Sequence, residues 1–432
     1  MKDNIRKSNK KGFIAFLMII IAVACFFGGY FIRDILKDPT VRTVEWVLES
    51  IVKNGYYMDE ETGDLKKFTG EEIADSIVKN FLDDYSSYYT AKEYTDVLAT
   101  NKGNNFGLGT TFLKATTDLE IFRVIGNSPA DNAGLKKGDI ITAVKIGDNR
   151  VDLSTREDLT ALLTGVNADE EFVLYALRNG VEMPFVVAKR VFTSSFVKYY
   201  DNKTVGKFIT ATDSQNKLEF ITETSDEMNN LPDGTAYIKY DSFSGQSAFE
   251  MDKVMEYVKT QNATNIILDL RDNGGGQMDI LTAVSSHFVK SDASKTPPIA
   301  FVRDAKGRLT HFSADDCKFI DNLQKIVVLA NDNTASASEC LIGAMLYYGA
   351  SFSRDNLVIE KGDGKSGTTY GKGIMQTTYY NVITGEAIKL TTAKVFLPDR
   401  YESIHGKGFK TTDENSVLPK DAIDRAIQII NG

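Results

Sequence analysis

The pattern of apolar and polar positions divides the chain into stretches of different character. From Val41 to Thr100, apolar residues recur at helical spacing, which predicts helices. From Gly103 onward, short alternating runs separated by glycine turns predict strands. Farther along, Ile266 to Leu270 and Ile326 to Ala330 are continuous apolar runs followed by helical patterns, which indicates buried strands of an α/β sheet.

The N-terminus combines positive charge with a long apolar run. Phe13 to Ile32 contains no charged residue and is long enough to cross a bilayer core of about 30 Å. Lysines and an arginine before it predict a cytoplasmic N-terminus with the remainder outside. A cleaved signal peptide or a lipoprotein site at Ala22 to Cys25 is the alternative. We favour an uncleaved signal anchor because the apolar run continues through Phe31.

Composition adds mainly exclusions. The 432 residues are enough for two or three domains, and 42% apolar with 25% charged residues is ordinary for a globular protein. A net charge of -9 does not favour a nucleic-acid partner. The three histidines and three cysteines do not occur at metal-ligand spacing, so neither a metal nor another cofactor is expected.

The segment Asn331 to Gly343, reading NDNTASASECLIG, follows the apolar run that ends at Ala330. This order predicts a strand, a tight turn and a helix start. A hydroxyl at that turn would lie beside unpaired backbone N–H groups, which stabilise developing negative charge. The alternative is that Thr334, Ser336 and Ser338 are ordinary turn and cap residues.

A second turn of the same kind follows Ile266 to Leu270 and reads Arg271 to Gly276, with three consecutive glycines before a helical pattern. Such a turn again exposes backbone N–H groups at a helix start. A phosphate-binding loop is the rival interpretation, but the chain contains no G-x-x-x-x-G-K-[ST] sequence.

Lys372 lies between two glycines and is the candidate base. A lysine can activate a serine only when neutral, which requires burial to lower its pKa by roughly 3 units from about 10.4. Gln376, four residues on, is neutral and could orient the amine without charging it. The alternative is a surface lysine in a flexible loop.

Residues 103–190 resemble a PDZ domain of the circularly permuted kind found in bacterial proteases. The resemblance rests on Ser128 to Ile141, SPADNAGLKKGDII, and on the order of the surrounding strands. By this resemblance, Gly107, Leu108 and Gly109 form the loop that holds a peptide C-terminal carboxylate through backbone N–H groups. The alternative is that these glycines merely form a turn.

Several motifs in one order extend the resemblance to nearly everything after the anchor. They are Leu82 to Tyr89, Leu268 to Gly276, Ser336 to Glu339, Tyr370 to Gly373 with Gln376, Leu390 to Lys394 and Ile404 to Gly408. The chain resembles the C-terminal processing (tail-specific) peptidases, membrane-anchored bacterial serine proteases with a PDZ domain and a Ser-Lys dyad.

The resemblance implies a multidomain α/β and α+β fold: a crotonase-like catalytic domain, an inserted PDZ domain and an N-terminal transmembrane helix. The expected domains are residues 1–35 (cytoplasmic tail and anchor), 36–102 (helical region), 103–190 (PDZ domain) and 191–432 (catalytic domain). The expected location is the cell membrane, crossed once, with the catalytic domain outside the cytoplasm. Expected partners are the membrane and protein substrates bound by their C-terminal tails, and a homodimer is one candidate assembly.

The resemblance also assigns roles at the site. Ser336 is the nucleophile, Lys372 the general base and later the acid, and Gln376 positions Lys372. The backbone N–H groups of Gly275 and Ala337 form the oxyanion hole. The implied reaction is endoproteolysis near a substrate C-terminus through an acyl-enzyme.

Two other functions remain open. One is a catalytically inactive PDZ scaffold that binds protein C-termini, and the other is a lipid-binding or small-molecule-binding protein on the same fold. The chain also departs from the family pattern, with Thr164-Gly165 where Arg-Gly is usual and a longer loop at Ser353 to Thr369.

Overall fold

The computed structural model describes residues 18, 37–54, 68–112, 119–210, 218–290, 296–349, 351–362, 367–399 and 402–432. The predicted membrane anchor, Phe13 to Ile32, lies outside these residues except for Met18. Among the helices in the described residues, none combines the length and the hydropathy needed to cross a bilayer. The chain divides into two compact units, Met1–Leu82 and Asp83–Gly432, which are described separately.

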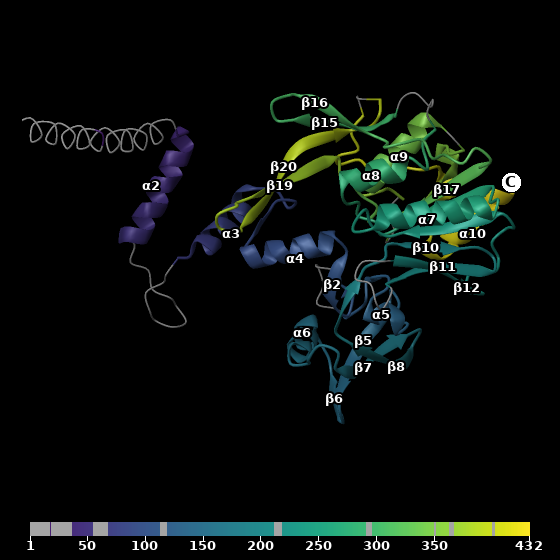
Figure 1. Ribbon diagram of the computed structural model, residues 1–432, viewed down its shortest axis with the longest axis horizontal. Coiled ribbons are helices and arrows are strands. Elements are labelled where there is room, and N and C mark those ends of the chain that lie inside the picture. Colours follow the sequence, from purple (N-terminus) through teal and green to yellow (C-terminus); the bar gives the residue numbers. More distant parts are fainter. Residues whose placement is uncertain are drawn as a thin grey trace, which may run out of the picture. The chain divides into compact units, whose positions relative to one another are not determined.

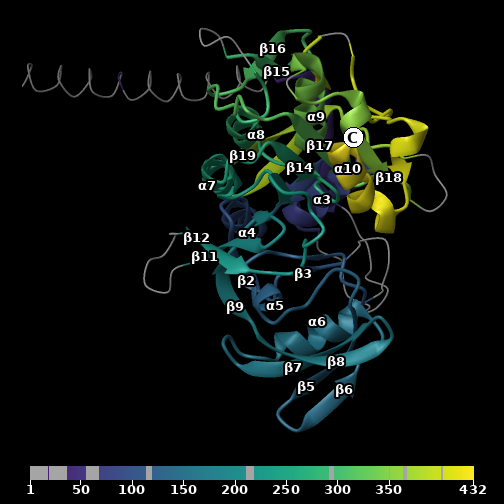
Figure 2. The same cartoon turned by 90° about the vertical axis from the view of Figure 1, so that its right-hand side faces the viewer.

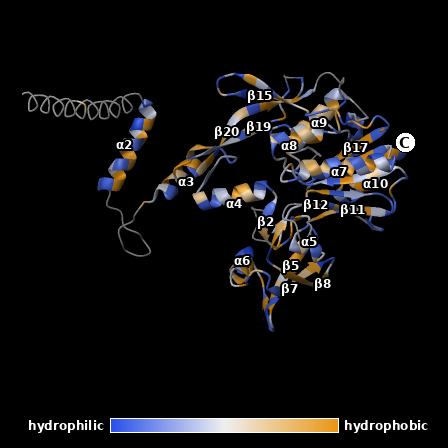
Figure 3. Ribbon diagram, in the orientation of Figure 1, coloured by the Kyte–Doolittle hydropathy of each residue, from blue (hydrophilic) through white to orange (hydrophobic). Residues whose placement is uncertain are grey.

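The described part of the first unit contains two helices, α2 (Pro39–Asn54) and α3 (Gly70–Phe81). Figure 3 shows polar and apolar residues interspersed along α2. At the start of α3, the Glu72 amide donates to Thr69 Oγ1 (3.2 Å) and the Thr69 amide donates to Glu72 Oε2 (2.9 Å). This reciprocal cap fixes the start of the helix.

The helical interpretation of Val41 to Thr100 is confirmed in α2, α3 and α4 (Ala91–Asn101) but is wrong at one point. Ser87–Tyr89 form a short strand, β1, which pairs antiparallel with β20 (Ala387–Phe396). The partner strand lies about 300 residues later in the sequence, so local periodicity could not reveal this pairing.

A small β domain follows α4 within the second unit. Its four-stranded antiparallel sheet has the order β6-β5-β7-β8, and α6 packs its Leu159 into the same core as Leu174 of β7 (Figure 2). Its elements are β5 (Ile140–Ile146), β6 (Asn149–Asp152), β7 (Glu171–Arg178), β8 (Val181–Ala188), α5 (Pro129–Asn132) and α6 (Arg156–Thr164). Two short antiparallel pairs complete it: β2 (Asn104–Gly107) with β9 (Arg190–Thr193), and β3 (Thr110–Thr111) with β4 (Arg123–Val124).

The largest sheet has the strand order β12-β11-β10-β13-β14-β17-β18-β21, parallel from β13 to β21 (Figure 1). Its strands are β10 (Val197–Tyr200), β11 (Thr204–Thr210), β12 (Leu218–Thr224), β13 (Thr235–Tyr240), β14 (Asn265–Asp269), β17 (Lys325–Ala330), β18 (Leu357–Glu360) and β21 (Ser416–Val417). The predicted buried strands are therefore confirmed as β14 and β17.

Helices cover both faces of this sheet, which explains the continuous apolar runs. Ile266 of β14 joins the core beneath α7 (Ser247–Thr260), α8 (Met278–Ser285) and α9 (Ala337–Tyr348). The next residue, Ile267, faces α10 (Ala422–Asn431) on the other side. Because successive side chains of a strand point to opposite faces, one apolar run supplies both cores.

A second sheet is built from strands that are far apart in the sequence. Its order is β1-β20-β15-β16, with β19 pairing on β20. The remaining strands are β15 (Pro298–Asp304), β16 (Leu309–Ser313) and β19 (Ile374–Tyr380). β19 begins two residues after Lys372, and β1 begins two residues after Tyr85, so this sheet fixes both approaches to the candidate site.

Candidate active site

Ser336 lies on the turn between β17 and α9, as the order of patterns predicts. Its backbone has φ 58° and ψ -115°, a positive φ that is uncommon for a residue other than glycine. Its amide donates to Glu339 Oε2 (2.9 Å), which stabilises this strained conformation. Strained backbone conformations of this kind are found most often at functional sites.

The two serines of the turn have different surroundings. Ser336 is half-buried and lines a cavity of about 940 Å³. Ser338 is fully buried and its hydroxyl donates to the Asn273 carbonyl (3.0 Å). The hydroxyl of Ser338 is therefore occupied with holding two turns together, whereas Ser336 borders open space.

The glycine turn after β14 packs directly against the serine turn. A Cβ built on Gly275, which has φ +93°, would lie 2.7 Å from the Ala337 amide nitrogen. Asn273 links the two turns, because its carbonyl accepts from the Ala335 amide (3.0 Å). Only glycine allows this approach of the two backbones.

The backbone N–H groups at this junction are not equivalent. The Gly275 amide donates to Asn273 Oδ1 (2.9 Å), whereas the amides of Ala337 and Gly276 have no acceptor within the described residues. The predicted donor Ala337 is thus available, and the predicted donor Gly275 is engaged. The neighbouring Gly276 offers a second available N–H group.

Lys372 reaches the same cavity from the loop before β19. Its flanking glycines pack closely: a Cβ on Gly371 would lie 2.8 Å from the Gly408 amide nitrogen, and one on Gly373 would lie 2.6 Å from that of His405. Burial lowers the pKa of Lys372, the positive charge of Lys389 lowers it further, and Asp83 opposes both. This direction is the one a neutral base requires.

Glu339 joins the serine turn to the lysine loop. Its Oε2 accepts from the amides of Ser336 (2.9 Å) and Lys372 (2.9 Å), and its Oε1 accepts from the Gly371 amide (2.8 Å) and Thr369 Oγ1 (2.5 Å). The side chain is fully buried. Burial raises the pKa of Glu339, although the four hydrogen bonds favour the charged form.

The sequence gives no role to Glu339, although it lies within the quoted Ser336 to Glu339 motif. The signal was present: a glutamate three residues after a serine at a helix start can reach back to the backbone N–H of that serine. The local sequence does not reveal that the same carboxylate also accepts from the amides of Gly371 and Lys372, because these residues belong to a distant loop.

Gln376 also lines the cavity, at a β-bulge between Met375 and Gln376 in the pairing of β19 with β20. A bulge changes the direction in which a side chain points. The Gln376 side-chain amide donates to Thr391 Oγ1 (3.1 Å). Within the described residues it makes no hydrogen bond to Lys372, so its positioning role stays a prediction.

No hydrogen bond joins the Ser336 hydroxyl to the Lys372 amine in the described part of the chain. Catalytic hydrogen bonds are often long in ligand-free enzymes and shorten when substrate binds. The described residues also contain no group of three or more histidine, cysteine or acidic side chains that could hold a metal ion.

The predicted tail-binding loop lies at the start of β3. Leu108 is buried in the core of the small domain, and its carbonyl accepts from the Ala130 amide (2.9 Å). Gly109 packs against Ser128, where a Cβ would clash at 2.1 Å. Within the described residues, the amides of Leu108 and Gly109 have no acceptor. Together with Gly107 (φ +135°), this loop presents free N–H groups.

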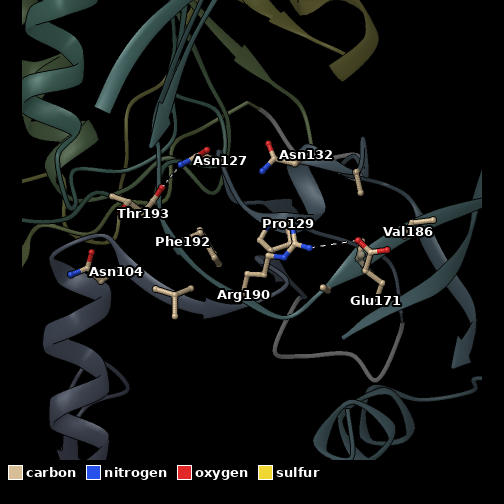
Figure 4. A pocket seen from close by; sticks show the side chains of 13 residues that line it. Asn104, Asn127, Pro129, Asn132, Glu171, Val186, Arg190, Phe192 and Thr193 are labelled. Carbon is tan, nitrogen blue, oxygen red and sulfur yellow. Dashed lines mark hydrogen bonds and ion pairs between the residues drawn. The ribbon is translucent and has the colours of Figure 1, made fainter. Parts of the chain in front are cut away.

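A separate cavity of about 730 Å³ lies among α5, β8 and β9 (Figure 4). Arg190 forms an ion pair with Glu171 there (3.6 Å), and Asn127 Nδ2 donates to the Thr193 carbonyl (2.8 Å). None of the predicted catalytic or tail-binding residues lines this cavity.

The small domain contacts the glycine turn through Asp272. Lys137 forms an ion pair with the Asp272 carboxylate, and Arg123 donates to the Asp272 carbonyl. The same carboxylate accepts from the side-chain amides of Asn331 (2.9 Å) and Asn333 (3.0 Å). One residue thus connects the small domain, the glycine turn and the segment that precedes Ser336.

The proteins to which this chain is similar are named as peptidases or proteases. Residues 234–414 match the model of peptidase family S41. A probable CtpA-like serine protease of Staphylococcus haemolyticus (strain JCSC1435) is 25% identical over 395 residues, which cover 90% of this chain and 68% of that protein. The protein of the same name from Staphylococcus aureus (strain N315) is 27% identical over 363 residues, covering 83% and 62%. The chain therefore spans about two thirds of the length of these relatives.

Among solved structures, the chain is similar to a photosystem II D1 C-terminal processing protease. The match has 20% sequence identity, covers 90% of each chain and has a TM-score of 0.49.

Proposed function

We propose that the chain is a serine endopeptidase that cleaves proteins near their C-termini, on the premise that residues 234–414 match peptidase family S41 and that its relatives are named CtpA-like serine proteases, as the resemblance to C-terminal processing peptidases predicts. The observation that carries the proposal is one cavity lined by Ser336, Lys372, Gly275 and Gln376. The strained serine, the lysine with a lowered pKa and the free amides beside them supply the parts that acyl transfer requires.

The proposed reaction begins with neutral Lys372 taking the hydroxyl proton of Ser336 as the serine oxygen attacks the scissile carbonyl carbon. The carbonyl oxygen becomes an oxyanion and receives hydrogen bonds from the available amides of Ala337 and Gly276, because the Gly275 amide is engaged by Asn273. The Lys372 ammonium then protonates the leaving amine as the C–N bond breaks. Water hydrolyses the remaining ester, with Lys372 again accepting the proton.

We also propose the finer architecture that the family implies. Residues 103–190 would be an inserted PDZ domain and residues 191–432 a crotonase-like catalytic domain. The free amides of Leu108 and Gly109 support binding of a substrate C-terminal carboxylate by the loop that begins at Gly107. The apolar segment 13–32 would anchor the chain, with residues 36–102 linking it to a catalytic region outside the cytoplasm.

An inactive scaffold that binds protein tails is the alternative function, and one experiment separates it from the protease. An unstructured protein with an apolar C-terminal tail is incubated with the full chain and with Lys372→Met, and tail binding is measured in parallel. The proposal expects cleavage near the tail by the wild type only, with tail binding retained in Lys372→Met. Equal binding without cleavage by either protein would favour the scaffold.

A further inference from the structure

Tyr85 borders the candidate active site although nothing so far gives it a role. It belongs to the segment Leu82 to Tyr89, which carries part of the family resemblance. Its side chain lines the same cavity as Ser336. The Lys372 ammonium nitrogen lies 4.8 Å from the centroid of the Tyr85 ring, within the range of a cation–π contact.

The ring is held from two directions. The Tyr85 amide donates to Asp83 Oδ1 (3.2 Å), which also accepts from Ser86 Oγ (2.8 Å). At its other end, the Tyr85 hydroxyl shares a hydrogen bond with the Tyr370 hydroxyl (3.1 Å). The Tyr370 amide donates to the Thr334 carbonyl (3.0 Å), so this second support belongs to the serine turn.

The charges around the amine explain why an aromatic face is useful there. Lys389 and Asp83 are the charged groups that act on Lys372. Among the described residues, Lys372 has no carboxylate within ion-pair distance. A carboxylate would hold the lysine charged, whereas a ring attracts the ammonium more weakly and excludes water from one side of the amine.

We propose that Tyr85 is a positioning residue for Lys372, whose ring face keeps water from the resting amine and supports the ammonium that forms when Ser336 attacks. This inference rests on the proposed function. The ring therefore acts in two opposite directions on the same amine. Exclusion of water favours the neutral base before the reaction, and attraction to the ring favours the cation during it.

Two substitutions separate these effects because they change the pH dependence of kcat/KM in opposite directions. Tyr85→Leu keeps an apolar wall but removes the ring, so the acid limb moves to lower pH by about 0.4 to 1.5 units. The maximal rate falls about 2- to 30-fold, because the ammonium loses its support. Tyr85→Ser admits water, so the pKa of Lys372 rises and the acid limb moves to higher pH.

Tyr370→Phe is the matched control. It removes the hydroxyl–hydroxyl hydrogen bond, but the contact of the Tyr85 amide with Asp83 still holds the ring beside Lys372, so the acid limb keeps its wild-type position. Tyr85→Phe also retains the ring, so it leaves the acid limb in place, whereas Tyr85→Ser moves it. This pair replaces the comparison with Tyr85→Leu if the leucine variant does not fold. Thermal unfolding of each variant is recorded under the same buffers.

The outcomes are distinct. Opposite shifts in the leucine and serine variants support the inference. Equal loss of activity at every pH with an unmoved limb, or shifts in the same direction, would overturn it and show a purely structural tyrosine. If the wild type cuts no tailed protein, or Ser336→Ala cuts as well as the wild type, the proposed function fails instead.

Discussion

Glu339→Gln tests whether one buried carboxylate holds the nucleophile and the base in a common geometry. The wild-type side chain accepts four hydrogen bonds, two on each oxygen, from Ser336, Lys372, Gly371 and Thr369. Glutamine has nearly the same shape but replaces one accepting oxygen with an NH₂ group. If the NH₂ group replaces Oε2, the amides of Ser336 and Lys372 face a donor. If it replaces Oε1, the Gly371 amide faces a donor, whereas the Thr369 hydroxyl can rotate to accept from it.

The magnitude follows from the contacts. A hydrogen bond to a charged group contributes about 1.5–3 kcal/mol, so the loss of one or two costs about 1.5–6 kcal/mol, depending on how the amide is turned. Either orientation of the amide leaves at least one backbone donor of the serine turn or the lysine loop without its acceptor, and that segment moves. If the free energy of one lost hydrogen bond is lost from the transition state but not from the ground state, kcat falls about 10- to 150-fold. The remainder lowers the free energy of unfolding.

The assay compares kcat on a tailed protein substrate with the free energy of unfolding, for Glu339→Gln and for Glu256→Gln. Glu256 is an exposed partner of Lys253 and serves as the matched control, with neither quantity expected to change appreciably. Wild-type kcat and stability in Glu339→Gln would refute the reasoning. A loss of stability with full activity would confine Glu339 to folding.

Two further predictions concern the base and the oxyanion hole. Lys389→Met removes a positive charge that lowers the pKa of Lys372, so the acid limb of the kcat/KM profile moves to higher pH. Lys394→Met, on the same strand, is the control and leaves the limb in place. An unmoved limb in Lys389→Met would contradict the electrostatic account. Gly275→Ala places a methyl group 2.7 Å from the Ala337 amide nitrogen at φ +93°, so product formation falls to background, and wild-type rates would show that this turn does not form the oxyanion hole.

Local patterns were sufficient for the main elements. The apolar residues between Ser247 and Thr260 recur at helical spacing, and this segment is the helix α7. Near the end of the chain, the apolar residues of α10 also recur at helical spacing. The buried strands β14 and β17 were recognisable because helices on both faces require continuous apolar sequence.

The contacts within the site depend on residues that are distant in sequence. Glu339 reaches the loop of Lys372, and the ring of Tyr85 reaches its amine, across long separations that no local pattern records. The hydrogen bond from Gly275 to Asn273 is local, but it depends on a side-chain rotamer that packing selects. Residue types could therefore be matched to chemistry, whereas their hydrogen-bond partners could not.

The most direct test of the central claim is to identify the serine that carries the reaction. The full chain, Ser336→Ala and Ser338→Ala are incubated with an unstructured protein that ends in apolar residues, and the products are measured by mass spectrometry. The account predicts cuts near the C-terminus by the wild type, none by Ser336→Ala, and residual cutting at the same positions by Ser338→Ala. Cutting by Ser336→Ala together with an inactive but folded Ser338→Ala would contradict it.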